Sequence, residues 1–277
     1  MTVFGLDAYA PAQIARRVSD VGVAKARLPF LTTAMLGVLA GAFIALGSLY
    51  YTLVAADATL GFAVQRVLGG LVFSVGLVLV VVAGGELFTG NNLLAMAWAD
   101  GAVSTRELLR NWVIALVANA VGAFGIALLV ALTAYPQMNG GAVGATAVKI
   151  ALAKAALPFW QAFFAGVLCN VFVCMAVWLA LAGRTVVDKF VAVILPISAF
   201  VAAGFEHSVA NMYFIPLGIL LRDSADLAGI AGAGGLDWGS YAGNLVPVTL
   251  GNILGGSGLV ALVYHFIYRR TAAARDD

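Results

Sequence analysis

Two short polar stretches interrupt the long apolar runs of this chain. Residues 84–92 read GGELFTGNN and residues 204–211 read GFEHSVAN, so each stretch places a carboxylate and several hydrogen-bonding side chains among apolar residues. A membrane offers such groups about 30 Å of hydrocarbon without water, and ionisable residues at that depth face a cavity or a protein partner. One interruption in each half of the chain therefore indicates two broken helices that meet around a solute pathway.

The composition around these stretches is that of an integral membrane protein. Hydrophobic residues make up 63% of the chain and charged residues 10%, against about 25% charged residues in ordinary soluble domains. The net charge of +2 gives no reason to expect a nucleic-acid partner, and membrane lipid is the expected surrounding. Two cysteines and two histidines in this arrangement fit no metal-ligand pattern, so we expect neither a metal nor a cofactor.

Long apolar segments divide the chain into six expected membrane spans, since each span needs about 20 apolar residues. We expect these spans at about 28–56, 67–99, 112–134, 155–182, 190–221 and 245–268. The second and fifth spans contain the two polar breaks. The resulting fold class is an all-α integral membrane protein with six transmembrane helices, of which helices 2 and 5 are broken.

The distribution of lysine and arginine predicts the orientation of these spans. An even number of spans puts both termini on one side, and eleven of the fifteen basic residues fall on that side. This bias predicts cytoplasmic termini. The expected organisation is a cytoplasmic segment (1–27), a channel domain (28–268) and a cytoplasmic tail (269–277), with residues 225–241 as an external loop.

The two halves of the chain repeat the same residues in the same order. Residues 25–30 read KARLPF and residues 154–159 read KAALPF. The acidic and amide positions of the breaks also repeat, as Glu86-x4-Asn91 and Glu206-x4-Asn211. Three spans in each half turn the second copy over, so the sequence predicts an inverted repeat of about 25–134 and 154–268.

The residues of the breaks suit an anionic solute. Gly84, Gly85 and Gly90 permit backbone angles that a helix forbids, and the half-helix after a break presents its positive dipole end. Thr89 offers a hydroxyl to the pathway or, alternatively, caps the second half-helix. His207 is the histidine at membrane depth, and it either passes a proton to a weak-acid anion or is a satisfied core residue.

The carboxylates of the breaks have a more structural interpretation. A carboxylate that lines an anion pathway repels the substrate. We therefore expect Glu86 and Glu206 to point away from the pathway and to hold the broken backbone in shape. Asn91 and Asn211 are their candidate partners, and Asn119 and Asn252 are candidates to bind freed backbone groups.

Two further polar residues have two interpretations each. Asn170 lies within the fourth span and either faces the pore or packs in the core. Lys154 precedes the fourth span on the side opposite the termini. It either snorkels to the interface or concentrates anions at a pore mouth.

These motifs together resemble the formate/nitrite transporter family. The similar segments cover residues 84–92, 166–178, 203–219 and 245–256 and so touch nearly all six spans. The resemblance implies an aquaporin-like protomer, a homopentamer in which each protomer has its own pore, and a multi-pass protein of the bacterial inner membrane.

The resemblance also implies roles for individual residues. The substrate pathway would contain His207, Thr89, Asn170 and Lys154. Two hydrophobic constrictions would flank His207. Phe73, Leu77 and Phe200 would form one on the cytoplasmic-facing part, and Leu87, Phe88 and Val173 would help to form the other. Such apolar rings exclude a naked anion far more than a neutral acid, so they make proton delivery matter.

The resemblance favours formate as the substrate. Residues 183–223 are similar to the formate branch of the family, whereas GGELFTGNN is similar to the nitrite branch in its last residues. Nitrite or hydrosulfide are the alternatives within the family, and a pore for water or glycerol is an alternative of another class. An intramembrane enzyme is disfavoured, because no nucleophile–histidine or His-Glu-x-x-His pattern accompanies His207.

Overall fold

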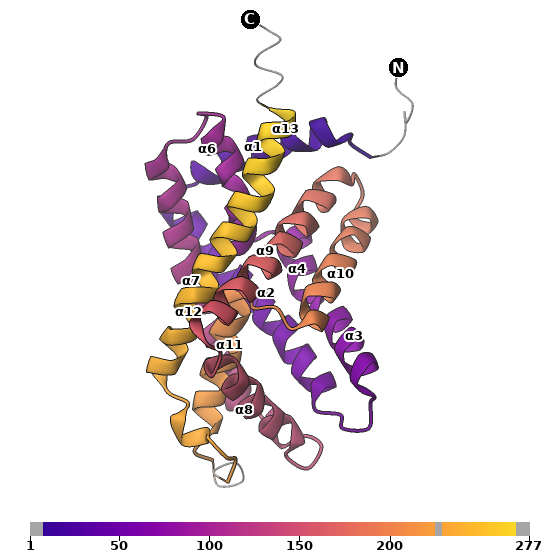
Figure 1. Cartoon of the computed structure of the whole chain (residues 1–277), viewed down its shortest axis with the longest axis vertical. Helices are drawn as coiled ribbons and strands as arrows, with labels where there is room; N and C mark the ends of the chain where they lie inside the picture. Colours follow the sequence, from indigo (N-terminus) through magenta and orange to yellow (C-terminus); the bar gives the residue numbers. More distant parts are fainter. Residues whose placement is uncertain (1–7, 225–228, 270–277) are drawn as a thin grey trace, which may run out of the picture.

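The computed structural model describes residues 8–224 and 229–269, and the regular elements in these residues are helices (Figure 1). The first half contains α1 (Pro11–Ala26), α2 (Phe30–Ala55), α3 (Phe62–Phe73), α4 (Val75–Leu79), η1 (Val80–Gly84), α5 (Phe88–Asn91), η2 (Asn92–Leu94), α6 (Ala95–Ala99) and α7 (Thr105–Ala131). The second half contains η3 (Tyr135–Gln137), α8 (Ala142–Ala155), α9 (Phe159–Ala182), α10 (Val186–Ala203), α11 (Ser208–Leu221), η4 (Ala233–Gly235), α12 (Trp238–Ile253), η5 (Leu254–Leu262) and α13 (Val263–Tyr268).

Six helices within the described residues are long and apolar enough to cross a membrane, which confirms the predicted fold class. They are Phe30–Ala55, Phe62–Gly84, Thr105–Ala131, Phe159–Ala182, Val186–Ala203 and Trp238–Tyr268. The shorter apolar helix α11 completes the fifth span after its break. The second span is completed in the same way by α5, η2 and α6.

A glycine in the left-handed region ends the first part of each broken span. Gly84 has φ +98° at the end of the π-helical turn η1, and Gly204 has φ +79° after α10. A side chain is strained at such angles, whereas glycine is not. The chain then runs extended for a few residues and re-enters a helix at Phe88 and at Ser208.

The two halves form the predicted inverted repeat, and each copy begins with a shorter helix ahead of its three spans. Figure 1 shows α1 and α13 at one end of the molecule and α8 at the other. Lys25 lies in the last turn of α1 and Lys154 in the last turn of α8, so the repeated lysines lie at opposite ends. The helix α8 was not expected, because its 14 residues are too few to span a membrane.

Several boundaries differ from those expected. α7 begins at Thr105 rather than near residue 112, because the Ser104 hydroxyl and the Glu107 carboxylate cap its charged first turn reciprocally. α12 begins at Trp238, after its Asp237 cap, so the last part of the expected loop 225–241 is helical. Residues 1–7, 225–228 and 270–277 lie outside the described residues, and with them most of the expected tail and part of the terminal segment and loop.

Glycines allow the helices that support the breaks to approach closely. A Cβ on Gly122 of α7 would collide with the carbonyl oxygen of Val38 on α2. A Cβ on Gly251 of α12 would collide in the same way with the carbonyl oxygen of Phe163 on α9. The equivalent helix pairs of the two repeats are therefore in backbone contact, the small-residue packing that is common inside membranes.

Candidate functional site

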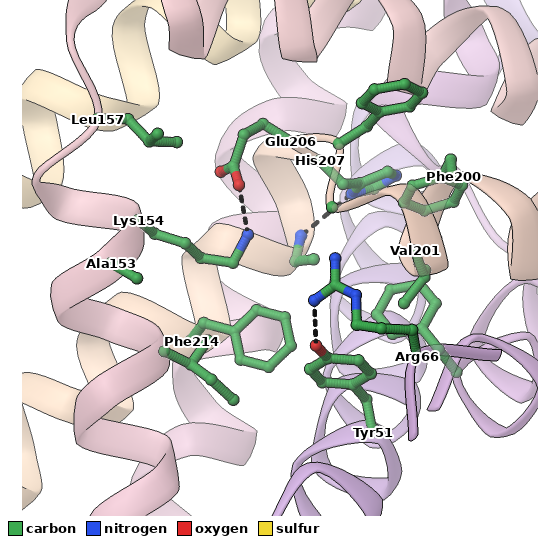
Figure 2. Close-up of a pocket in the computed structure, with 15 residues that line it drawn as sticks. Tyr51, Arg66, Ala153, Lys154, Leu157, Phe200, Val201, Glu206, His207 and Phe214 are labelled. Carbon is green, nitrogen blue, oxygen red and sulfur yellow. Dashed lines mark hydrogen bonds and ion pairs between the residues drawn. The ribbon is translucent and has the colours of Figure 1, made fainter. Parts of the chain in front are cut away.

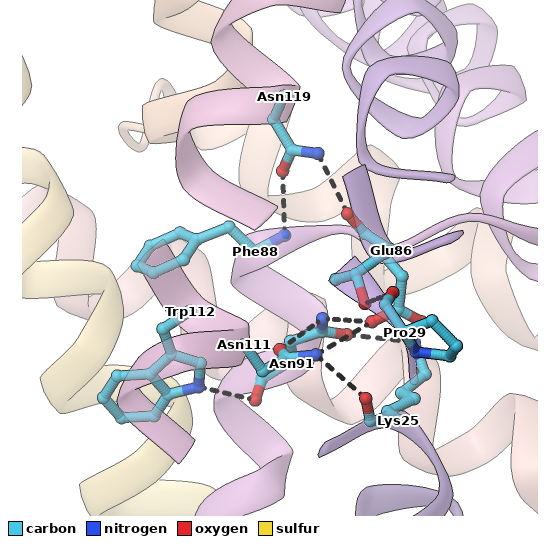
Figure 3. Close-up of polar contacts among 9 residues, drawn as sticks. Lys25, Pro29, Glu86, Phe88, Asn91, Asn111, Trp112 and Asn119 are labelled. Carbon is cyan, nitrogen blue, oxygen red and sulfur yellow. Dashed lines mark hydrogen bonds and ion pairs between the residues drawn. The ribbon is translucent and has the colours of Figure 1, made fainter. Parts of the chain in front are cut away.

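Each break is held by a buried carboxylate that binds a lysine and an asparagine. In the first break, Glu86 lies 2.8 Å from Lys25 Nζ and accepts a hydrogen bond of 2.7 Å from Asn91 (Figure 3). In the second, Glu206 lies 2.8 Å from Lys154 Nζ (Figure 2). Asn211 completes this second network and donates a hydrogen bond of 2.6 Å to Glu206. The sequence predicts the asparagines beside the carboxylates, but it does not indicate that the lysines pair with them.

A second pair of asparagines, which the sequence motifs of the breaks do not include, extends both networks. Asn111 accepts a hydrogen bond from Asn91 and donates one to the carbonyl oxygen of Lys25. Asn244 does the same for Asn211 and Lys154. These residues lie outside the breaks themselves, on α7 and α12. The spacing between the repeats could have identified them, because Asn111 and Asn244 are as far apart as Asn119 and Asn252.

Asn119 and Asn252 bind the freed backbone of the breaks. Asn119 Oδ1 accepts from the Phe88 N–H at 2.8 Å, and its Nδ2 donates to the carbonyl oxygens of Gly37 and Glu86. Asn252 accepts from the N–H of Ser208 and donates to the carbonyl oxygens of two residues, Gly166 and Glu206. An unpaired backbone group at this depth is costly, so these side chains replace the hydrogen bonds that the broken helices lose.

We expect Asn119→Leu and Asn252→Leu to destabilise the protein by similar amounts. Each substitution removes three hydrogen bonds and strands buried backbone groups, at about 1–3 kcal/mol for each group left without a partner. Thermal unfolding of the purified protein in detergent measures the effect. A variant as stable as the wild type at either position contradicts the equivalence of the two breaks.

The two breaks meet at a hydrogen bond between Thr89 and His207. Thr89 Oγ1 lies 3.0 Å from His207 Nε2, and His207 Nδ1 accepts a hydrogen bond from the N–H of Ala210. Because Nδ1 is the acceptor, a neutral imidazole carries its proton on Nε2 and donates it to Thr89. Both side chains are buried, with exposed fractions of 0% for Thr89 and 2% for His207.

Two cavities approach this hydrogen bond from opposite sides. The Lys154 cavity has a volume of about 270 Å³ and is lined by Lys154, Glu206 and His207 among others (Figure 2). The Lys25 cavity has a volume of about 340 Å³ and is lined by Lys25, Glu86 and residues of α1. The buried Thr89–His207 pair therefore lies between a cavity at the end of α8 and one at the end of α1.

The structure divides the two expected apolar rings differently from the sequence analysis. Phe73 and Phe200 line the Lys154 cavity, on the side opposite α1, and their rings meet edge to face at 5.9 Å. Leu77 lines the Lys25 cavity together with Leu87. The expectation that Phe73, Leu77 and Phe200 form one ring on the side of the termini is therefore wrong. The two phenylalanines line the Lys154 cavity, and Leu77 lines the Lys25 cavity.

Phe88, Val173 and Asn170 line neither of these two cavities. Phe88 packs edge to face on Trp112 (Figure 3), and Val173 is buried in the core. Asn170 is fully buried, and its Nδ2 lies within hydrogen-bond distance of the Thr89 carbonyl oxygen, the Asn92 side chain and the Asn252 carbonyl oxygen. Asn170 thus links the first break, beside Thr89, to α12 without lining either cavity.

Comparisons with known proteins agree with this architecture. The family described as "Formate/nitrite transporter" matches residues 12–266. The chain belongs to this family. It is 37% identical to the formate channel FocA of Escherichia coli K12 over 95% of this chain and 96% of the relative. It is 40% identical to a probable formate transporter of Methanothermobacter thermautotrophicus over 93% of this chain and 96% of that relative.

Solved structures of the formate/nitrite transporter family have the same fold. A pentameric formate channel with formate bound has a TM-score of 0.80 and 37% identity, over 86% of this chain and 97% of that one. An ion channel of the family has a TM-score of 0.80 and 30% identity, over 92% and 98%. The chain is thus a multi-pass membrane channel or transporter rather than an enzyme.

Proposed function

We propose that the protein carries formate across the membrane together with a proton, past His207. The Thr89–His207 hydrogen bond of 3.0 Å carries this proposal, since it puts a titratable group in a buried layer between two cavities. Formate channels at 37% identity and a related structure with formate bound support the substrate.

The chemistry follows from the cost of moving a charge through an apolar layer. A naked anion loses its hydration between the Phe73–Phe200 pair and the Leu77–Leu87 pair, whereas a small neutral acid loses far less. In the proposed step, His207 takes up a proton on Nδ1, which then no longer accepts from the Ala210 N–H, holds the anion through Nε2–H and gives it that Nε2 proton. The imidazole then regains a proton from the side of entry, so one formate and one proton cross together.

The other residues of the pathway have supporting roles in this proposal. Lys154 draws the anion into its cavity. Asn170 holds the Thr89 carbonyl and so fixes the Thr89 hydroxyl beside His207. Glu86 and Glu206 bind lysines and asparagines instead of facing the substrate, which keeps their negative charge compensated.

The assembly and orientation belong to the same proposal. The solved relative with formate bound is pentameric, and we propose a homopentamer with one pathway in each protomer. The excess of basic residues on the side of the termini supports cytoplasmic termini in a bacterial inner membrane. Under this orientation the Lys154 cavity opens toward the outside.

Uptake into proteoliposomes tests the function. We expect saturable formate uptake that increases as the external pH falls and that is accompanied by alkalinisation of the external medium. Nitrite and glycerol, offered at equal concentration, are the comparisons. If nitrite uptake clearly exceeds formate uptake, the substrate is nitrite rather than formate. Glycerol uptake without formate uptake overturns the proposal.

A further inference from the structure

The Lys154 cavity carries one more positive charge than the Lys25 cavity. In each cavity a lysine is paired with a buried glutamate, and the two charges compensate each other. The Lys154 cavity is additionally lined by Arg66 of α3. Within residues 8–224 and 229–269, no carboxylate lies within ion-pair distance of Arg66. The second break therefore has an uncompensated guanidinium in its cavity, and the cavity of the first break has none among its lining residues.

Two hydrogen bonds hold this guanidinium at the edge of the second break. Arg66 Nε donates to the carbonyl oxygen of Ala202 at 2.8 Å, and Arg66 Nη1 donates to the Tyr51 hydroxyl at 3.3 Å. Nη2 lies over Gly204, where an added Cβ would stand 2.6 Å from it. A Cβ built on Gly84, the glycine that ends the other half-helix, meets nothing within 4 Å. Glycine at position 204 thus leaves room for the arginine as well as for the turn.

Arg66 and Lys154 point into the cavity from two different walls (Figure 2). Two aromatic rings lie beside them: Lys154 Nζ is 5.4 Å from the Phe214 ring, and this ring is 5.9 Å from the Tyr51 ring. His207 lines the same cavity. An anion that enters here therefore meets the uncompensated charge of Arg66, the paired Lys154 and the imidazole in one cavity.

We propose that Arg66 forms, with Lys154, an entry subsite for a small planar carboxylate in the Lys154 cavity. The proposal rests on the proposed function, because it takes formate as the ligand. A guanidinium presents parallel N–H groups that match the two oxygens of a carboxylate, and its partners Ala202 and Tyr51 fix the plane of this fork in advance. The Lys25 cavity lacks such a residue among those that line it, so the affinity for formate differs between the two faces of the protein.

Arg66 also has a structural role that a test must separate from anion binding. Its bond to the Ala202 carbonyl places a positive charge at the C-terminal end of α10, where a cation stabilises a helix. Loss of this role alone lowers the amount of folded protein or the maximal flux from both faces equally. Loss of an entry subsite instead raises the half-saturating formate concentration from one face.

Formate flux in right-side-out and inverted membrane vesicles distinguishes these roles. We expect Arg66→Gln to raise the half-saturating formate concentration about tenfold on the face of the Lys154 cavity, equivalent to about 1.4 kcal/mol. The other face keeps its wild-type value. Arg66→Lys retains the charge without the fork, and we expect a rise of about threefold. Arg222→Gln changes an arginine near the same end that does not line the cavity, and it serves as the matched control.

A variant that keeps the arginine tests the subsite even if Arg66→Gln fails to fold. Tyr51→Phe removes the hydroxyl that orients Nη1, and we expect it to raise the half-saturating concentration about threefold on the same face. Unchanged half-saturation in Arg66→Gln and Tyr51→Phe, in vesicles where the wild type carries formate, overturns the subsite alone. A wild type that carries no formate from either face overturns the proposed function and the subsite with it.

Discussion

Replacement of His207 by phenylalanine is expected to abolish proton-coupled formate transport and to leave the protein folded. The phenyl ring can keep the stacking of His207 on Phe200, whose ring centroid lies 5.9 Å away at an angle of 20°. The variant loses the bond to Thr89 and the helix cap to the Ala210 N–H, and the cap costs about 1 kcal/mol. Since proton transfer by a positioned side chain contributes about 100-fold or more, we expect formate uptake in proteoliposomes to fall by at least that factor.

Thr89→Val is the matched control for this experiment. It removes the hydroxyl that accepts the Nε2 proton but retains the imidazole, so we expect transport to weaken while its dependence on pH remains. Formate uptake by His207→Phe at the wild-type rate, without a dependence on pH, contradicts the proton-transfer role and makes His207 a structural residue. Thermal unfolding of both variants separates loss of transport from loss of fold.

The sequence predicts the breaks and the repeat because both depend on residue types that a membrane helix avoids. Carboxylates, asparagines and paired glycines at membrane depth leave few structural solutions. The repeat follows from residues such as Lys25 and Lys154, which stand at equivalent places in two copies of three spans. The helix α8 does not follow, because its alanine-rich sequence is too short to be recognised as a span.

The side that an apolar residue faces is harder to predict than its presence in a constriction. Phe73 and Phe200 lie on spans that run in opposite directions, and both residues precede a break near the middle of the protein. Their place along the chain therefore does not determine which cavity they line. The packing does so: the ring of Phe200 lies against both Phe73 and His207, and all three residues line the cavity of Lys154.

Contacts between distant residues account for the remainder of the site. Arg66 is a basic residue at the start of a span, which on sequence alone indicates an interfacial position. Its role depends on Ala202 and Tyr51, which lie 136 and 15 residues away in the chain. The lysine–glutamate pairs likewise form only when α1 and α8 fold against the breaks.

Replacement of Lys154 by leucine is expected to be the most destabilising change on this side of the protein. Glu206 is 4% exposed, and without its ion pair of 2.8 Å the carboxylate keeps only polar contacts such as that from Asn211. Removal of one partner of a buried ion pair costs about 3–5 kcal/mol, because the remaining charge is uncompensated. Thermal or denaturant unfolding in detergent measures this loss for Lys154→Leu.

The double variant Lys154→Leu/Glu206→Gln separates the structural contribution of the pair from anion attraction. The glutamine oxygen still accepts from Asn211 and no charge is left buried, so we expect most of the lost stability to return. Formate uptake from the face of the Lys154 cavity is expected to stay low, because the cation that draws the anion is still missing. Lys25→Leu/Glu86→Gln makes the equivalent change in the other repeat and is expected to weaken uptake from the opposite face. Wild-type uptake by the first double variant contradicts a role of Lys154 in anion capture and leaves the ion pair a purely structural support of the break.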